Sequence, residues 1–183
     1  MKADELLFKT YRVLRQRNLI TAESMEALAH APRPDTICGV RIPANLNAMT
    51  LDTLTDLLAT KGNELEAIKV ITGIEPQRLD KCLAVDVVGV ANFIRDELKR
   101  IADLFRQLRP TYTAEERQAG IEDLDFGFFG TVDWYARRMG ITDHDEVMQV
   151  GWLKVWQCAK IDKENQDFQR RLQKVYNNQN AKP

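Results

Sequence analysis

The sequence predicts a mainly α-helical protein, a multi-helix bundle with at most one small strand or hairpin element near residues 36–42. Three observations predict this class. Apolar residues recur every three or four positions over long stretches, as on the buried face of an amphipathic helix. Pairs such as Thr113 and Glu116 have the spacing of a capping box, which marks the start of a helix. Only one short segment, residues 36–42, alternates in the manner of a strand.

Length and composition indicate a folded, globular chain. It has 183 residues, of which 44% are hydrophobic and 29% are charged, and this balance argues against a disordered protein. The formal net charge is −1, so no global basic field attracts nucleic acid or anionic lipid. The most apolar run, residues 83–94, is too short to cross a bilayer, and the first residues do not resemble a secretory signal. We therefore expect a cytoplasmic protein with no membrane partner.

The cysteines support the same expectation. Cys38, Cys82 and Cys158 are odd in number and far apart in the sequence. Such a set is typical of buried thiols in a reducing compartment and not of a disulfide framework.

The first 35 residues predict a pair of helices. One suits residues 4–17, and Thr21 is placed to cap a second, which Pro32 and Pro34 end because proline cannot donate a backbone hydrogen bond. The strand candidate at 36–42 follows, and Pro43 closes it. A single strand has to pair with a second short strand or with another subunit.

Residues 36–110 predict a helical unit around which the chain is organised. Thr50 is a good N-cap, the chain breaks at residues 61–62, and Pro76 suits the first turn of a short helix. A long helix then carries an apolar stripe that ends before Pro110. The stripe predicts a bundle core, with a docking groove for another protein as the less favoured alternative. Its members are Leu83, Val87, Ala91, Ile94, Leu98, Ile101, Phe105 and Leu108.

Residues 111–183 predict a second helical unit with Trp-rich helices. Gly120 ends a short helix, a glycine-aromatic link spans 125–130, and a helix is expected from Thr131 to Met139. Thr142 is expected to cap the next helix, whose stripe runs through the tryptophans. A later stripe extends it, at Ile161, Phe168, Leu172 and Val175.

Two segments resemble functional motifs without meeting their requirements. The acidic run 143–146 contains His144, yet no second histidine lies on the same helical face, so helix-start carboxylates explain it better than a metal site. Residues 136–142 have the spacing of a helix-turn-helix, but the following helix would present three carboxylates to phosphates. No nucleophile elbow or phosphate-binding loop occurs. We expect no enzyme activity, no cofactor and no metal.

For the exposed faces of these helices, binding to another protein is the role that the sequence favours. Large aromatic and arginine side chains anchor many protein interfaces, and leucines on a helix face line docking grooves. The candidate partner-binding residues are Leu54, Leu57, Leu58, Ile94, Leu98, Trp134, Tyr135, Arg137, Arg138, Trp152 and Trp156.

A family resemblance lies in the middle unit. The segment Ile42–Leu57, which leads from the strand candidate into a leucine-rich helix, resembles the opening of tail assembly chaperones of long-tailed bacteriophages. The match continues through the helix and turn at residues 67–79 and the start of the long helix at 84–88, so it covers about residues 36–108. Residues 128–135 through 168–172 are similar to uncharacterised proteins of tailed phages and prophages.

The resemblance implies a non-enzymatic phage tail assembly factor in the cytoplasm of the bacterial host. Such proteins bind the tape-measure protein, keep its apolar helices soluble and help recruit tail-tube subunits. Two alternatives stay open: a small DNA-binding or packaging protein that uses the helix pair at 131–160, and a structural adaptor of the virion. The resemblance leaves the oligomeric state open.

Overall fold

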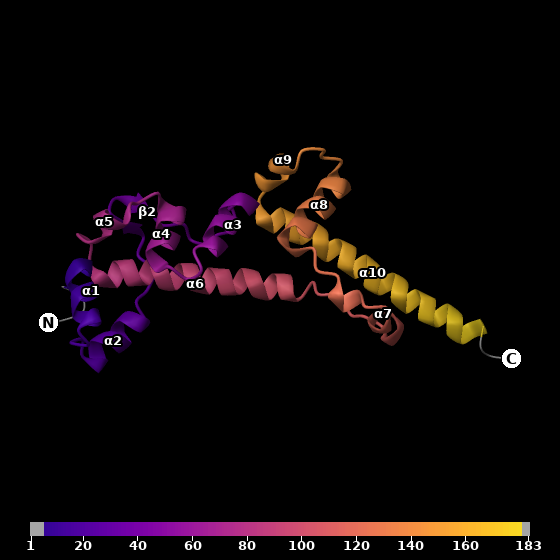
Figure 1. Ribbon diagram of the computed structural model, residues 1–183, viewed down its shortest axis with the longest axis horizontal. Coiled ribbons are helices and arrows are strands. Elements are labelled where there is room, and N and C mark those ends of the chain that lie inside the picture. The colour runs from indigo at the N-terminus through magenta and orange to yellow at the C-terminus, as the bar shows by residue number, and fades with distance from the viewer. Residues whose placement is uncertain (1–5, 181–183) are drawn as a thin grey trace. The chain divides into compact units, whose positions relative to one another are not determined.

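The computed structural model describes residues 6–180 and confirms the predicted class (Figure 1). Within that range the chain forms ten α-helices, one short 3-10 helix and one two-stranded antiparallel sheet. None of these helices combines the length and the apolar character needed to cross a bilayer. In chain order the elements are α1 (Phe8–Gln16), α2 (Ala22–Ala29), β1 (Thr36–Ile37), β2 (Val40–Arg41), α3 (Leu51–Ala59), α4 (Glu64–Thr72), α5 (Pro76–Leu79), α6 (Ala84–Arg106), α7 (Ala114–Gln118), η2 (Ile121–Asp123), α8 (Gly127–Met139), α9 (His144–Met148) and α10 (Trp152–Asn180).

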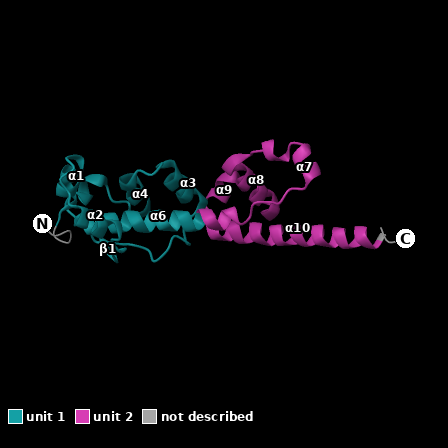
Figure 2. Cartoon of the chain, turned by 90° about the horizontal axis from the view of Figure 1, so that it is seen from below, with its two compact units in different colours: residues 1–101 teal, residues 102–183 magenta. Residues whose placement is uncertain are grey.

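The chain divides into two compact units, residues 1–101 and 102–183 (Figure 2). The predicted N-terminal helical pair, α1 and α2, shares unit 1 with the sheet and with α3 to α5. Most of α6 belongs to this unit, and its last turn is counted in unit 2.

Residues 36–42 form a hairpin and not a single strand. Thr36 pairs with Arg41 and Ile37 with Val40, so the two-residue strands β1 and β2 are partners of one another. Cys38 and Gly39 turn the chain, with φ angles of +49° and +81°. Positive φ at both turn residues is the geometry that matches the twist of a two-residue hairpin. The strand predicted at 36–42 therefore finds its partner within its own segment.

The predicted caps at Thr21 and Thr50 are confirmed. The helix expected over residues 4–17 begins at Phe8 in the described part of the chain. The side chains of Thr21, Thr50 and Asn63 each accept a hydrogen bond from the backbone N–H three residues later. These bonds satisfy donors that the first turn of a helix leaves without partners. Gly73 ends α4 in the left-handed conformation, and Pro76 occupies the first turn of α5.

The core of unit 1 forms along α6. Four members of the predicted stripe, Val87, Ala91, Ile94 and Ile101, are buried, as expected for a bundle core, whereas Leu98 is half-buried. Gly89 faces the loop after α2, because a Cβ on this residue would collide with the backbone carbonyl of Pro32. The absence of a side chain at residue 89 thus lets α6 approach that loop closely.

A polar cluster fastens the loop before α3 to α6. Glu97 accepts a hydrogen bond from the backbone N–H of Leu46 at 2.8 Å. Arg100 donates to both carboxylate oxygens of Glu97 at 2.8 Å and to Oδ1 of Asn47 at 2.7 Å. The hydrogen bond from Arg100, and then that from Leu46, lower the pKa of the Glu97 carboxyl, while burial opposes them.

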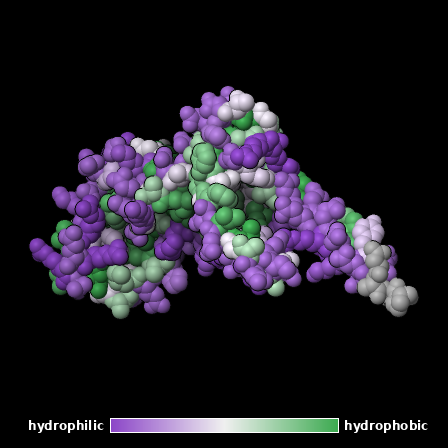
Figure 3. All heavy atoms as spheres, turned by 45° about the vertical axis from the view of Figure 1, so that its right-hand side comes forward, coloured by the Kyte–Doolittle hydropathy of each residue, from purple (hydrophilic) through white to green (hydrophobic). Residues whose placement is uncertain are grey.

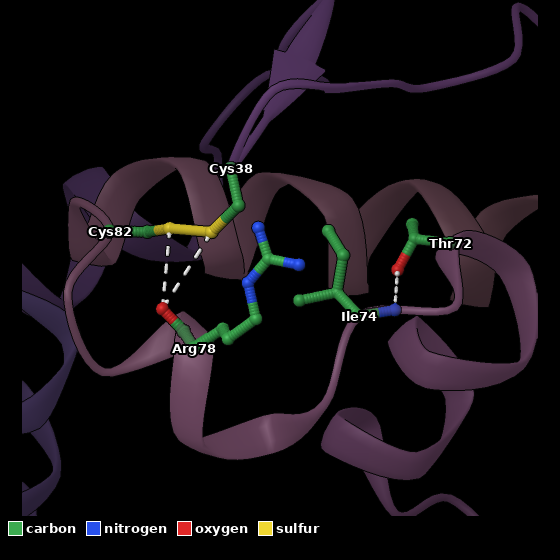
Figure 4. Close-up of a disulfide and its surroundings, with 5 residues drawn as sticks. All are labelled: Cys38, Thr72, Ile74, Arg78 and Cys82. Atoms are coloured by element: carbon green, nitrogen blue, oxygen red, sulfur yellow. Dashed lines mark hydrogen bonds between the residues drawn. A yellow bond between two sulfur atoms is a disulfide. The ribbon is translucent and has the colours of Figure 1, made fainter.

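The expectation of three free thiols is wrong for two of them, so the cysteines no longer support a reducing compartment. Cys38, at the tip of the hairpin, and Cys82, just before α6, form a disulfide with a Cα–Cα distance of 6.6 Å (Figure 4). Their sulfur atoms lie 3.7 and 3.9 Å from the carbonyl oxygen of Arg78. Both cysteines are half-buried, and only Cys158 of the three is free. The 44-residue separation concealed the pair, because the fold that brings the hairpin to α6 is not a local property of the sequence.

Unit 2 follows the predicted order with three differences. The capping box of Thr113 and Glu116 is confirmed at the start of α7. The helix α8 begins at Gly127, one turn before the expected start at Thr131, and Asp143, not Thr142, caps α9. One helix was expected to run from the cap at Thr142 through the tryptophans, but residues 149–151 separate α9 from α10. Gly151 at this break has a low helix propensity.

Candidate functional site

An apolar groove lies between α3, α4 and α6, which we call the α3–α4–α6 groove. Its volume is about 260 Å³. All of its lining residues belong to unit 1, and the apolar ones come from each of the three helices. They are Leu57 and Leu58 of α3, Ala67 of α4, and Ala91, Ile94 and Leu98 of α6.

The apolar lining combines fixed and accessible side chains. Leu57 and Ile94 are almost completely buried, so their positions are set by the core of unit 1. Leu98 is half-buried, and Leu58 is 57% exposed although it is a large apolar residue. The groove therefore has accessible apolar side chains that a second molecule could contact, and buried side chains beneath them hold its shape.

The polar lining residues carry both signs of charge. Glu64, in the first turn of α4, and Arg95 of α6 contribute an exposed carboxylate and an exposed guanidinium. Arg95 also lies 3.5 Å from the carboxylate of Asp96, on the solvent side of α6. Opposite charges beside an apolar groove suit a polypeptide with a mixed surface better than an anionic polymer.

Four of the predicted partner-binding residues come together in this groove. Leu57, Leu58, Ile94 and Leu98 line it, whereas Leu54 is buried in the core of unit 1 and is not part of the lining. Sequence reasoning missed the contribution of α4, and with it Ala67 and Glu64. The signal for α4 was present in its cap at Asn63, but no periodicity shows which face of α4 meets α6.

The other predicted residues lie in unit 2 and have different environments. Tyr135 and Trp152 are fully buried core residues. Trp156 is half-buried, and its indole N–H donates to the carbonyl oxygen of Leu104 at 3.0 Å. Trp134 lines a smaller cavity, of about 170 Å³, beside Asp162 and Pro110. These aromatics thus mainly hold unit 2 together.

The two predicted arginines are engaged with carboxylates. Arg137 lies 2.8 Å from Asp133, one turn earlier on α8, and Arg138 donates to Asp162 of α10 at 2.9 Å. The guanidinium of Arg138 also lies 6.0 Å from the ring of Trp134. Each of the two arginines therefore has a carboxylate partner within unit 2.

A further apolar surface was not recognised from the sequence. The segment expected as a glycine-aromatic link exposes Phe126 and Phe129, and Leu124 just before it is exposed as well. Figure 3 shows hydrophobic residues gathered in patches among hydrophilic ones on the face that it draws. The three phenylalanines within residues 126–129 could have indicated this surface, but the segment was interpreted as a link.

The acidic run 143–146 starts a helix. Asp143 caps α9 through a bond from the backbone N–H of Asp145, and His144 lies 3.6 Å from Asp133. In the part of the chain that the structure describes, no group of three or more His, Cys, Asp or Glu side chains is arranged to hold a metal ion.

Comparisons of the chain with protein-family models, with curated proteins and with solved structures find no match.

Proposed function

We propose that the chain is a non-enzymatic assembly factor that binds an apolar helix of a partner protein in the α3–α4–α6 groove. The observation that carries this proposal is the exposed side chain of Leu58 beside the half-buried Leu98, at a groove whose deeper walls are fixed core residues. Helix-in-groove recognition uses this arrangement, since a partner helix places apolar side chains from one face into such a groove.

The size of the groove favours a polypeptide ligand. At about 260 Å³ it is smaller than the roughly 300–1,000 Å³ of most small-molecule sites. A partner helix inserts only its anchoring side chains and rests the remainder of its surface on the surroundings. The mixed charges of Glu64 and Arg95 can then contact polar residues at the border of that helix.

The resemblance of residues 36–108 to tail assembly chaperones gives the partner an identity. In this proposal the bound helix belongs to a phage tape-measure protein, in the cytoplasm of the bacterial host, and the chain shields its apolar face until tail-tube subunits replace it. All three helices that line the groove lie within the segment that carries the resemblance.

The DNA-binding alternative has weaker support. Arg137 and Arg138, which would have to face phosphates, are paired with Asp133 and Asp162. The helix in the recognition position, α9, has five residues, and its first turn is acidic. Recognition helices place several side chains along the major groove, which a single acidic turn does not provide.

The test is co-expression of the full chain with a tape-measure protein encoded beside it, followed by affinity capture. We expect Leu58→Asp to reduce capture strongly, because it places a carboxylate in the apolar groove. Leu19→Asp is the matched control, since Leu19 is 62% exposed, lies in unit 1 and is outside the groove. Circular dichroism of both variants should show the wild-type helix content.

Equal capture by wild type and Leu58→Asp would contradict the groove as the binding site. A parallel DNA titration at about 0.15 M salt, where non-specific electrostatic binding is weakened, addresses the alternative. Sequence-selective DNA binding together with no capture of the tape-measure protein would transfer the function to the helices at 131–160. Presence of the chain in purified particles would favour the virion adaptor.

A further inference from the structure

The second half of α10 carries apolar side chains without burying any of them. Among its described side chains after residue 160, none is buried. Ile161, Phe168 and Val175 are 51%, 50% and 51% exposed, and Leu172 is half-buried. Figure 2 shows this half of α10 as one continuous helix within unit 2. Such a row of exposed apolar residues is unusual on a monomeric surface and marks a contact face.

The contacts of α10 with its own unit lie on the opposite face. Arg170 donates to the carbonyl of Thr111, and its other amino group donates to Glu116 at 3.2 Å. Two residues along a helix correspond to about 200° of rotation, so Arg170 points away from Phe168 and Leu172. Trp152, which is buried in unit 2, precedes Arg170 by eighteen residues. Eighteen residues are five whole helical turns, so Trp152 and Arg170 lie on the same face of α10. The apolar row is therefore free of the packing that holds α10 in place.

The spacing of the row is that of a coiled coil. The steps from Ile161 through Asn165, Phe168 and Leu172 to Val175 are four, three, four and three residues. This pattern is the 3.5-residue repeat of a heptad, with Ile161, Phe168 and Val175 at d and Cys158, Asn165 and Leu172 at a. Residues 158–178 then span three heptads on one face.

We propose that this face forms a parallel, in-register coiled coil with a second copy of the chain. Asn165, the polar residue in the middle of the row, indicates which molecule covers this face. Against an apolar helix, the amide of Asn165 would lose its water without gaining a partner. In a parallel pair of identical helices, Asn165 of each copy meets Asn165 of the other in the same layer, which is how a single asparagine at a sets register and favours two strands.

The residues that flank the seam agree with this arrangement. In a parallel pair, each g position faces the e position of the next heptad in the other helix. Glu164 then faces Gln169 of the second copy, and Arg171 faces Tyr176. No like charges meet across the seam, and an arginine beside a tyrosine ring is favourable. The self-association uses unit 2 alone and is independent of the α3–α4–α6 groove.

The free thiol of Cys158 can distinguish parallel from antiparallel pairing of the two helices. Cys158 occupies the first a position and is half-buried in the single chain. Parallel, in-register pairing brings it beside Cys158 of the second copy, whereas antiparallel pairing separates the two by the length of the seam. Two adjacent thiols can be joined by diamide, which accepts both hydrogen atoms as the disulfide forms and is itself reduced to a hydrazine.

The experiment uses the full chain and measures its mass in solution by sedimentation over a range of concentrations. We expect a dimer for wild type and a dissociation constant raised at least about tenfold by Phe168→Glu, equivalent to about 1.4 kcal/mol. Gln173→Glu is the matched control, because it adds the same charge at an exposed position outside the seam. Asn165→Leu should associate more tightly and as more than two strands. Leucine at a, combined with the β-branched Ile161 and Val175 at d, favours higher oligomers once the asparagine layer is removed.

Diamide should then produce a cross-linked dimer from wild type and from Gln173→Glu, and none from Cys158→Ser. Circular dichroism of Phe168→Glu shows whether the variant keeps the wild-type helix content, so that unfolding is not mistaken for a loss of association. A chain that stays monomeric at every concentration overturns the proposal. A dimer that Phe168→Glu leaves intact, or one that diamide does not cross-link through Cys158, overturns the parallel seam.

Discussion

The side-chain amide of Asn92 donates a hydrogen bond to the backbone carbonyl of Leu28, which lies 64 residues earlier in the last turn of α2. The same nitrogen lies 3.2 Å from the carbonyl oxygen of Ala29 and 3.4 Å from that of Ala31. The last carbonyls of a helix have no partners within it. A buried side chain on α6 thus completes the end of a helix that is distant in the sequence.

We expect Asn92→Ala to lower the free energy of unfolding by about 1–3 kcal/mol, because it leaves buried carbonyl oxygens without their donor. Chemical denaturation followed by circular dichroism measures the change. Asn178→Ala, at an exposed position of α10, is the control and should alter stability by less than about 0.5 kcal/mol. Equal stability of Asn92→Ala and wild type would show that water replaces the amide.

The cluster around Glu97 predicts a dependence of stability on acid. Because its pKa is lowered in the folded chain, Glu97 binds a proton more readily when the chain is unfolded. Its contribution is therefore complete above the ordinary glutamate pKa of about 4.3 and is lost as the pH falls through the lower value of the folded state.

We expect Glu97→Gln to cost about 1–2 kcal/mol at pH 7, below the usual worth of charged hydrogen bonds because the Arg100 side chain is 38% exposed. The difference between variant and wild type should shrink as the pH is lowered below about 4. Denaturant unfolding at several pH values measures it. A difference that is independent of pH would assign the loss to packing and not to the ionised carboxylate.

The disulfide predicts a loss of stability on reduction. Opening the bond between Cys38 and Cys82 releases a 44-residue loop in the unfolded chain, and removing such links typically costs about 2–4 kcal/mol. Thermal unfolding of the Cys38→Ser/Cys82→Ser variant, compared with wild type without reductant, measures the effect. Cys158→Ser should unfold like wild type at protein concentrations where the chain is monomeric. Adding reductant should change wild type and leave the double variant unchanged.

Local signals in the sequence predicted the helices well. Thr21, Thr50 and Thr113 all cap the helices that they were expected to cap, because a cap depends on residues three positions apart. The hairpin was harder, since the alternation over residues 36–42 indicates one strand, and cysteine, which occupies the turn at residue 38, rarely adopts a positive φ. The break before Trp152 was hidden by a periodicity that continues across it.

The groove could be predicted only in part. Leu57, Leu58, Ile94 and Leu98 follow from the apolar faces of two helices, but the face that α4 presents to them depends on the loop geometry at Gly62 and Gly73. The buried state of Tyr135 and Trp152 likewise depends on the packing of α8 and α10. Periodicity indicates which residues seek burial, and tertiary contacts decide which of them obtain it.

The disulfide makes a covalent ring of the segment from Cys38 to Cys82, and α3 and α4, two of the three walls of the groove, lie inside that ring. A peptide bond cleaved anywhere between the two cysteines would leave the two fragments attached. Such a nicked chain would migrate as two pieces on a denaturing gel only after reduction.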